Sequence, residues 1–92
     1  MKLDLPDIYL VRPDVRQDLS NGQPVVALES AVITHGLPRP ANLELALSME
    51  AIVRGQGAIP ATIAFIDGKI VIGASESELR RLAEENNPIK IN

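Results

Sequence analysis

The chain has 92 residues, which suits one small domain or part of a larger one. Its hydrophobic fraction of 46% excludes a disordered tail, and the absence of cysteine excludes disulfides and cysteine-based zinc sites. A net charge of -3, no basic stripe and 2% aromatic residues argue against a nucleic-acid polymer as partner, whereas a pocket for a single nucleotide needs only a few polar groups. No apolar run reaches the length of a signal peptide or a membrane span, so we expect a cytoplasmic chain without membrane contact.

The first predicted helix begins at Pro13, because proline favours the first turn of a helix. Val15 and Leu19 share one face of it, and Asn21-Gly22 ends it. The short apolar run of residues 25–28 follows, bounded by turn residues. This pattern is typical of a strand buried on both faces of a parallel sheet, and here the strand ends at Glu29 and Ser30.

From about Asn42 the apolar period becomes helical and continues to the stop signal of Gly55 and Gly57. We expect the buried face of this helix to carry Leu45, Met49, Ile52 and Val53. Glu50 and Arg54 lie four residues apart, and we expect them on the solvated side.

Residues 62–66 and 69–72 are β-rich runs, and Asp67-Gly68 between them predicts a hairpin. Ser75-x-x-Glu78 is a capping box that starts a last helix, supported by the pairs Glu76–Arg80 and Arg81–Glu85. Residues 89–92 have the pattern of a strand that is just beginning, and a finished domain rarely stops there. The pattern therefore predicts an α/β fold, namely the N-terminal portion (residues 1–92) of an α/β/α layered domain with one β-hairpin, apparently truncated.

Glu29 is the first candidate for chemistry, because the carboxyl end of a buried strand is where α/β folds place their ligand crevice. Partial burial there favours the neutral carboxylic acid, which suits a general acid near neutral pH. The alternative is a strand-end carboxylate that accepts a hydrogen bond from a loop amide.

His35 and Lys90 are weaker candidates. His35 is the only histidine, so an all-protein zinc site is not expected, and a structural role in its loop is the simpler interpretation. Lys90 lies between Ile89 and Ile91 and could meet a phosphate as a point charge. The alternative is an edge-strand lysine that prevents aggregation.

Three segments taken in order resemble the pseudouridine-5'-phosphate glycosidase family, also called indigoidine synthase A-like. They are Val-Val-Ala-Leu-Glu-Ser at residues 25–30, Thr-His-Gly-Leu-Pro-Arg-Pro at residues 34–40, and Gly-Ala-Ile-Pro-Ala-Thr-Ile-Ala at residues 57–64. The resemblance runs from about Pro24 to the end of the chain.

The resemblance implies reversible cleavage of the C–C glycosidic bond of pseudouridine 5'-phosphate, giving uracil and ribose 5-phosphate. It implies a lysine imine that holds C1' and a carboxylic acid that protonates the base. By the same resemblance Glu29 is the proton donor and Lys90 a substrate-contacting lysine, although the family often has Thr where this chain has Ala31.

The same resemblance places the imine-forming lysine and the aspartate associated with a divalent metal, manganese in the family, beyond Asn92. No metal ligand is expected within the chain itself. We therefore expect the chain alone to be inactive and the intact protein to be a homo-oligomer, a trimer by resemblance. Two alternatives stay open, a non-catalytic truncated fragment and a small nucleotide-binding α/β module.

Overall fold

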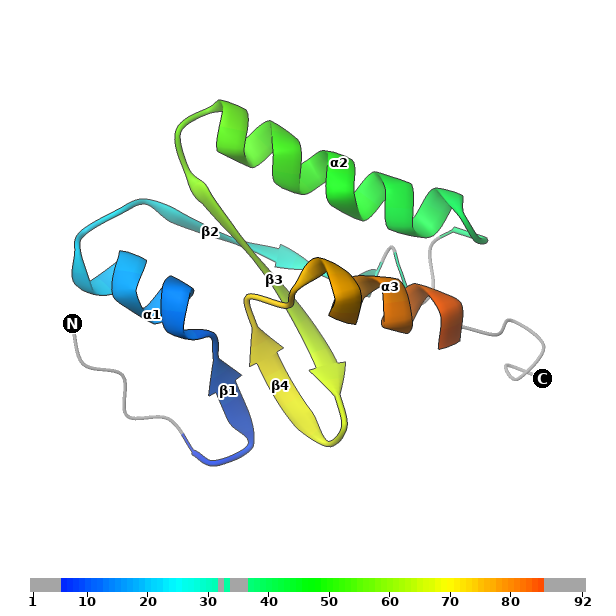
Figure 1. The fold of residues 1–92 in the computed structure, drawn as a ribbon, viewed down its shortest axis with the longest axis horizontal. Helices are drawn as coiled ribbons and strands as arrows, with labels where there is room; N and C mark the ends of the chain where they lie inside the picture. The colour runs from blue at the N-terminus through cyan, green and yellow to red at the C-terminus, as the bar shows by residue number, and fades with distance from the viewer. Residues whose placement is uncertain (1–5, 32, 34–36, 86–92) are drawn as a thin grey trace.

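The computed structural model of the chain describes residues 6–31, 33 and 37–85. In this part of the chain the elements follow one another as β1 (Tyr9–Val11), α1 (Pro13–Ser20), β2 (Val25–Glu29), α2 (Ala41–Gly55), β3 (Ile59–Ile66), β4 (Lys69–Ile72) and α3 (Glu76–Glu85). The strands form a 4-stranded sheet in the order β1-β4-β3-β2 (Figure 1). The pairs β2–β3 and β1–β4 are parallel, and β3–β4 is antiparallel, which confirms the mixed α/β fold class.

The predicted hairpin joins β3 to β4. Asp67 and Gly68 both have positive φ, 52° and 77°, as a two-residue type I′ turn requires. Strand β3 begins at Ile59, three positions before the predicted start, because residues from Ile59 onward pair with β2 despite Pro60. The sequence did not predict β1, since three residues are too few to display an alternating pattern.

Side chains alternate along β3 and divide the sheet into two faces. Thr62, Ala64 and Ile66 face α2 and α3, which cover that side in Figure 1. Ala61 faces α1 on the opposite side. The core on the α2 and α3 side is aliphatic, with Ile33, Val71 and Leu79 at most 2% exposed.

Helix α1 has the predicted bounds and packs through Val15 and Leu19. It lies tightly against Gly73, where a Cβ atom would be 2.6 Å from Val15 Cγ2. Gly73 also has a φ of +95°, so glycine is required there for two reasons.

The predicted buried face of α2 is wrong, although the helix itself is confirmed. Its buried residues are Asn42, Ala46 and Glu50, whereas Leu45 is 40% and Ile52 63% exposed. The reason is polar: Glu50 Oε2 accepts a hydrogen bond from the Thr62 hydroxyl of β3 at 2.6 Å, so its carboxylate is buried rather than solvated. Both sides of α2 carry apolar residues, and the period alone could not select the side that faces the sheet.

The prediction that residues 25–28 are buried on both faces is also wrong for the described part of the chain. Strand β2 lies at the edge of the sheet, where Val26 is 39% exposed and Ala27 is exposed as well. An apolar run indicates that both faces of a strand are to be buried, but it does not say which residues cover them. The described residues include none that cover β2 on its exposed side.

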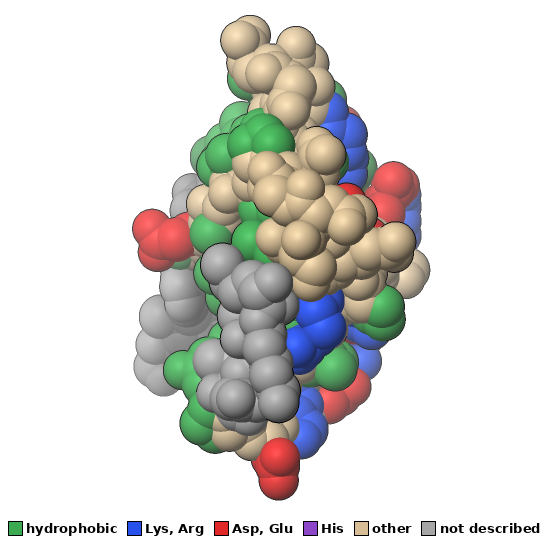
Figure 2. Space-filling view, turned by 90° about the vertical axis from the view of Figure 1, so that its left-hand side faces the viewer, with side chains coloured by type: hydrophobic (Ala, Val, Ile, Leu, Met, Phe, Trp, Pro, Cys, Tyr) green, Lys and Arg blue, Asp and Glu red, His purple; other side chains and the backbone are tan. Residues whose placement is uncertain are grey.

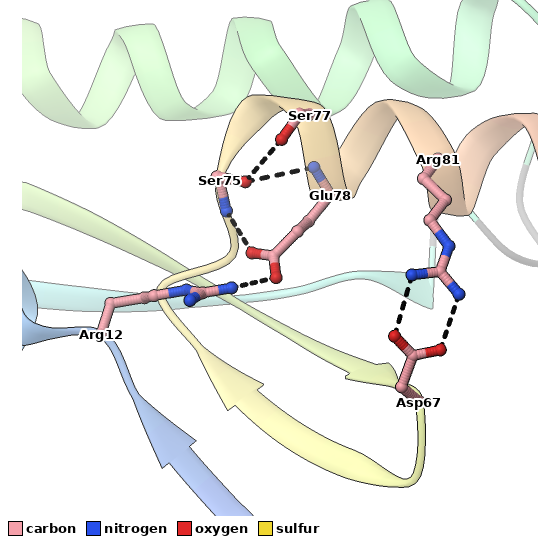
Figure 3. A network of polar contacts seen from close by, with 6 residues as sticks. All are labelled: Arg12, Asp67, Ser75, Ser77, Glu78 and Arg81. Carbon is pink, nitrogen blue, oxygen red and sulfur yellow. Dashed lines mark hydrogen bonds and ion pairs between the residues drawn. The ribbon is translucent and has the colours of Figure 1, made fainter.

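The capping box of α3 is confirmed (Figure 3). The Ser75 amide N–H donates to Glu78 Oε1 at 2.9 Å, and the Glu78 amide N–H donates to Ser75 Oγ at 3.2 Å. Arg12, which lies between β1 and α1, forms an ion pair with the same Glu78 carboxylate. Burial raises the pKa of Glu78, but the Ser75 amide and Arg12 outweigh it and hold that pKa below its ordinary value.

The pairs Glu76–Arg80 and Arg81–Glu85 form as predicted, at 3.0 and 2.7 Å. The sequence did not predict a second partner for Arg81, whose guanidinium donates to both oxygens of Asp67 at 2.9 and 2.6 Å (Figure 3). This forked pair ties the hairpin turn to α3. The hydrogen bond to Arg81, and then its charge, lowers the pKa of Asp67.

Glu78→Gln tests how much the charge of the Glu78 carboxylate, which pairs with Arg12 and caps α3, stabilises the fold. Because the folded chain holds the pKa of Glu78 below 4.5, the stabilisation is present above pH 4.5 and is lost as the pH falls through the lowered value. We expect the variant to lower the free energy of unfolding at neutral pH and to flatten its decrease between about pH 5 and 3, measured by urea unfolding. Glu84→Gln, at an exposed position of the same helix, should leave the slope unchanged. An unaltered slope in Glu78→Gln would contradict the assignment.

Thr62→Val tests the buried bond to Glu50. The substitution keeps the shape of the side chain but leaves a buried carboxylate oxygen without its donor, which should cost about 1–3 kcal/mol of unfolding free energy. Replacing both partners (Glu50→Leu with Thr62→Val) should recover most of that loss, since no unsatisfied group stays behind. If the double variant is less stable than Thr62→Val, the bond is not the reason for the burial of Glu50.

Candidate functional site

Glu29 is the last residue of β2 and lies at the carboxyl end of that strand, as predicted. In the parallel pairing it is opposite Ile63, so both side chains lie on the face of the sheet that α1 covers only in part. The expectation of partial burial is not met, because Glu29 is exposed. The reason is again the edge position of β2, which leaves one side of the carboxylate without a neighbour among the described residues.

An open pocket of about 360 Å³ lies beside Glu29. Apart from Glu29 it is lined by Ser30, Ala31, Ile63, Ala64, Phe65 and Ile70. One carboxylate therefore faces a wall that is mostly apolar. A carboxyl group in such a pocket could exchange a proton with a molecule bound against the wall.

Sequence reasoning did not include Ile63, Phe65 and Ile70 in the site. A signal was present, since alternation along β3 places Ile63 and Phe65 on one face, and the Asp-Gly turn sets Phe65 opposite Ile70. What could not be read from the sequence is the pairing of β3 with β2, which brings this wall next to Glu29.

Asn42, at which the sequence predicts only the start of a helix, holds Ile33, four residues after Glu29. Asn42 is 0% exposed and its Nδ2 donates to the carbonyl oxygens of Ile33 at 3.2 Å and Ala83 at 3.4 Å. Its Oδ1 accepts from the Leu43 amide at 2.8 Å. The Ile33 amide in turn donates to the Ser30 carbonyl at 2.9 Å. One buried amide thus links α2 and α3 to the segment that directly follows Glu29.

Lys90 and His35 lie outside the described residues, so their predicted roles stay predictions. Within residues 6–31, 33 and 37–85, no group of three His, Cys, Asp or Glu side chains is placed to hold a metal ion. In the same part of the chain no helix is long and apolar enough to cross a membrane.

A second hollow, also of about 360 Å³, lies between α1, α2 and the start of α3. It contains Arg12 and Arg54, but these pair with Glu78 and Glu50. Asp14 and Glu76 also line it, so it offers no excess positive charge to an anion. On the face shown in Figure 2, the described Lys and Arg side chains are interspersed with Asp and Glu and form no continuous basic band. The Glu29 pocket is therefore the better candidate site.

Comparison with known proteins identifies the family of the chain. The profile of the family described as "Indigoidine synthase A like protein" matches residues 14–92. The pseudouridine-5'-phosphate glycosidase of Staphylococcus aureus (strain MW2) is 53% identical over 78 residues, covering 85% of this chain and 25% of the relative. The protein of the same name from Arabidopsis thaliana is 54% identical over 79 residues, covering 86% of this chain and 24% of the relative.

Two solved structures share the fold. An indigoidine synthase A-like protein from Thermotoga maritima aligns with a TM-score of 0.69 at 36% identity, covering 91% of this chain and 28% of that one. The prealnumycin C-glycosynthase AlnA, in complex with ribulose 5-phosphate, aligns with a TM-score of 0.69 at 37% identity, covering 88% of this chain and 26% of that one. The chain spans about a quarter of the length of the curated relatives, 25% for the S. aureus protein. The curated relatives are named pseudouridine-5'-phosphate glycosidase, so their family is a family of enzymes. The chain belongs to this family, the indigoidine synthase A-like family.

Proposed function

We propose that the chain forms part of a pseudouridine-5'-phosphate glycosidase, in which Glu29 is the proton donor. The observation that carries the proposal is the position of Glu29 at the carboxyl end of β2, beside an apolar wall and inside the family match of residues 14–92. The names of the relatives supply the substrate, pseudouridine 5'-phosphate. The ribulose 5-phosphate bound to AlnA supports a pentose phosphate as the class of sugar.

The chemistry requires a proton donor because the leaving group is a carbon atom. A lysine amine first forms a bond to C1' while the bond from C1' to the ring oxygen breaks, and the ring oxygen takes up the proton that the amine loses. The bond between C1' and C5 of uracil then breaks as the lysine nitrogen forms its double bond to C1'. The electron pair of the broken bond goes to C5, and the neutral acid of Glu29 gives C5 a proton. The sugar stays behind as an imine on a lysine, and water hydrolyses that imine to ribose 5-phosphate. In this step Glu29 ends as a carboxylate and regains a proton before the next turnover.

Lys69 does not fit the role of that lysine. Its Nζ donates to the Asp7 carbonyl oxygen at 2.7 Å, and it follows the hairpin turn at the start of β4. The imine-forming lysine is therefore proposed to lie outside the described residues. The ligand of the metal, Mn²⁺, is likewise proposed to lie outside the described residues, since no cluster of described side chains is placed to hold a metal ion.

The remaining properties follow from the same assignment. Lys90 is proposed to contact the substrate, and the intact protein to be a cytoplasmic homo-oligomer, a trimer. The chain alone is proposed to be inactive, because a proton donor without the lysine lacks a member of the catalytic unit. The exposure of Glu29 favours one alternative, a non-catalytic fragment, because the described residues leave its carboxylate open to solvent.

A chimera distinguishes the proposed catalytic role of Glu29 from the alternative of a non-catalytic fragment. In the S. aureus glycosidase, the segment that matches this chain is replaced by residues 14–92, and uracil release from pseudouridine 5'-phosphate is followed by chromatography. Glu29→Gln should lower kcat by about 100- to 10,000-fold with a much smaller effect on KM, because an amide cannot supply the proton.

The matched control is Glu44→Gln, which changes an exposed carboxylate on α2 and should leave kcat unchanged. An active chimera in which Glu29→Gln keeps its rate would exclude Glu29 as the donor. Uracil release by the chain alone would refute its proposed inactivity.

A further inference from the structure

Asn42 is buried as fully as the apolar core, at 0% exposed. Burying an amide side chain costs free energy unless its donors and its acceptor find partners. Here they do: Nδ2 donates to the carbonyl oxygens of Ile33 and Ala83, and Oδ1 accepts from the Leu43 amide. The Asn42 amide in turn donates to the Pro38 carbonyl oxygen at 3.0 Å, which anchors the residue itself. An apolar side chain would fill the space without such partners, so what Asn42 contributes is its hydrogen bonds.

The bond to Ala83 caps a helix. Ala83 lies in the last turn of α3, where carbonyl groups have no partner within the helix. The next carbonyl group, that of Glu84, accepts a hydrogen bond from Arg39 Nη1 at 3.2 Å. Residues just before and at the start of α2 therefore satisfy the end of α3.

The bond to Ile33 acts on a different segment, the one that leaves β2. The Ile33 side chain is 0% exposed and belongs to the core that α2 and α3 cover. Its amide donates to the Ser30 carbonyl oxygen at 2.9 Å, so the chain from Ser30 to Ile33 closes one turn. Ser30 directly follows Glu29. Asn42 thus holds the far end of a turn whose near end adjoins Glu29.

Glu29 depends on this turn because its other described restraints are few. Within the described sheet β2 pairs only with β3, and Glu29 lies opposite Ile63. The Glu29 side chain is exposed, so its direction follows from the backbone more than from packing around the carboxylate. The course of the chain just after Glu29 is therefore a second restraint on where that carboxylate points.

We propose that Asn42 is a positioning residue for Glu29. By holding the Ile33 carbonyl group it fixes the turn after β2, and so directs the Glu29 carboxyl group into the adjoining pocket. The inference rests on the proposed role of Glu29 as proton donor, and Asn42 acts only through that residue. A proton donor must lie within hydrogen-bond reach of the atom that it protonates, and a displacement of about 1 Å can cost about 100-fold in rate.

The test is a double-mutant cycle in the S. aureus chimera that carries residues 14–92. Asn42→Ala removes both donors, and it should lower kcat by about 10- to 100-fold while KM changes by less than about threefold. In the Glu29→Gln chimera the same substitution should change kcat by less than about twofold. A residue that acts through Glu29 has little left to affect once the acid is absent.

Thr62→Val is the matched control, because it also removes a buried hydrogen bond of α2, the one to Glu50. Its kcat should stay within about twofold of the parent chimera, at a temperature at which circular dichroism shows every variant folded. Asn42→Ser is a milder second variant. Serine is favourable at the start of a helix, but its single hydroxyl proton cannot serve both carbonyl oxygens, so kcat should fall in the same direction.

The Ile33 amide gives a readout that does not require turnover. Its hydrogen exchange should be faster in Asn42→Ala and Asn42→Ser than in the parent chimera, because the turn that it closes loses its outer support. In Thr62→Val the exchange rate of the same amide should stay unchanged.

The outcomes separate this inference from the proposed function. If Glu29→Gln keeps the parent rate, the proposed function fails, and the positioning role fails with it. If Glu29→Gln is slow but Asn42→Ala lowers kcat equally in both backgrounds, or no more than Thr62→Val does, only the positioning role is refuted. Unchanged exchange at Ile33 also refutes it. So does failure of both Asn42 variants to fold, because Asn42 then supports the whole fold and not one turn.

Discussion

The fold depends on the alternation of side chains along β3. This strand pairs with β2 on one side and β4 on the other, and all three helices contact it. Thr62, Ala64 and Ile66 require cover from α2 and α3, which they receive. Ile63 and Phe65 point to the other face, where α1 ends before it reaches them. Among the described residues, one strand therefore carries both the covered face of the sheet and the part of the other face that α1 does not cover.

The elements that could be predicted from sequence are those whose cause is local. The Asp67-Gly68 turn and the Ser75 capping box depend on residues a few positions apart, and both form as expected. The face of α2 depends instead on a hydrogen bond between Glu50 and Thr62, 12 positions apart, on different elements. Hydrophobic periodicity places Glu50 on the solvated side of the helix. The hydroxyl of Thr62, which makes the burial of Glu50 favourable, lies outside any stretch of sequence used to read that periodicity.

In the candidate site, too, only the feature with a local cause could be predicted from the sequence. The end of an apolar strand marks Glu29, and that position is what the sequence establishes. The wall beside it comes from β3 and β4, and the connection after it is held by Asn42. These depend on strand order and on buried carbonyl groups, which a single sequence does not specify. Partial burial of Glu29 was inferred from a strand covered on both faces, and it fails with that premise.

The proposed chemistry of Glu29 depends on what surrounds its side chain at the edge of the sheet. A proton donor must lie within reach of the atom that it protonates, in a site that holds the substrate in place. The apolar residues that could form one wall of such a site, Ile63, Phe65 and Ile70, are in place on one side of Glu29. The opposite side borders the free edge of β2. The proposed role of Glu29 as proton donor therefore depends on what lies beside this edge.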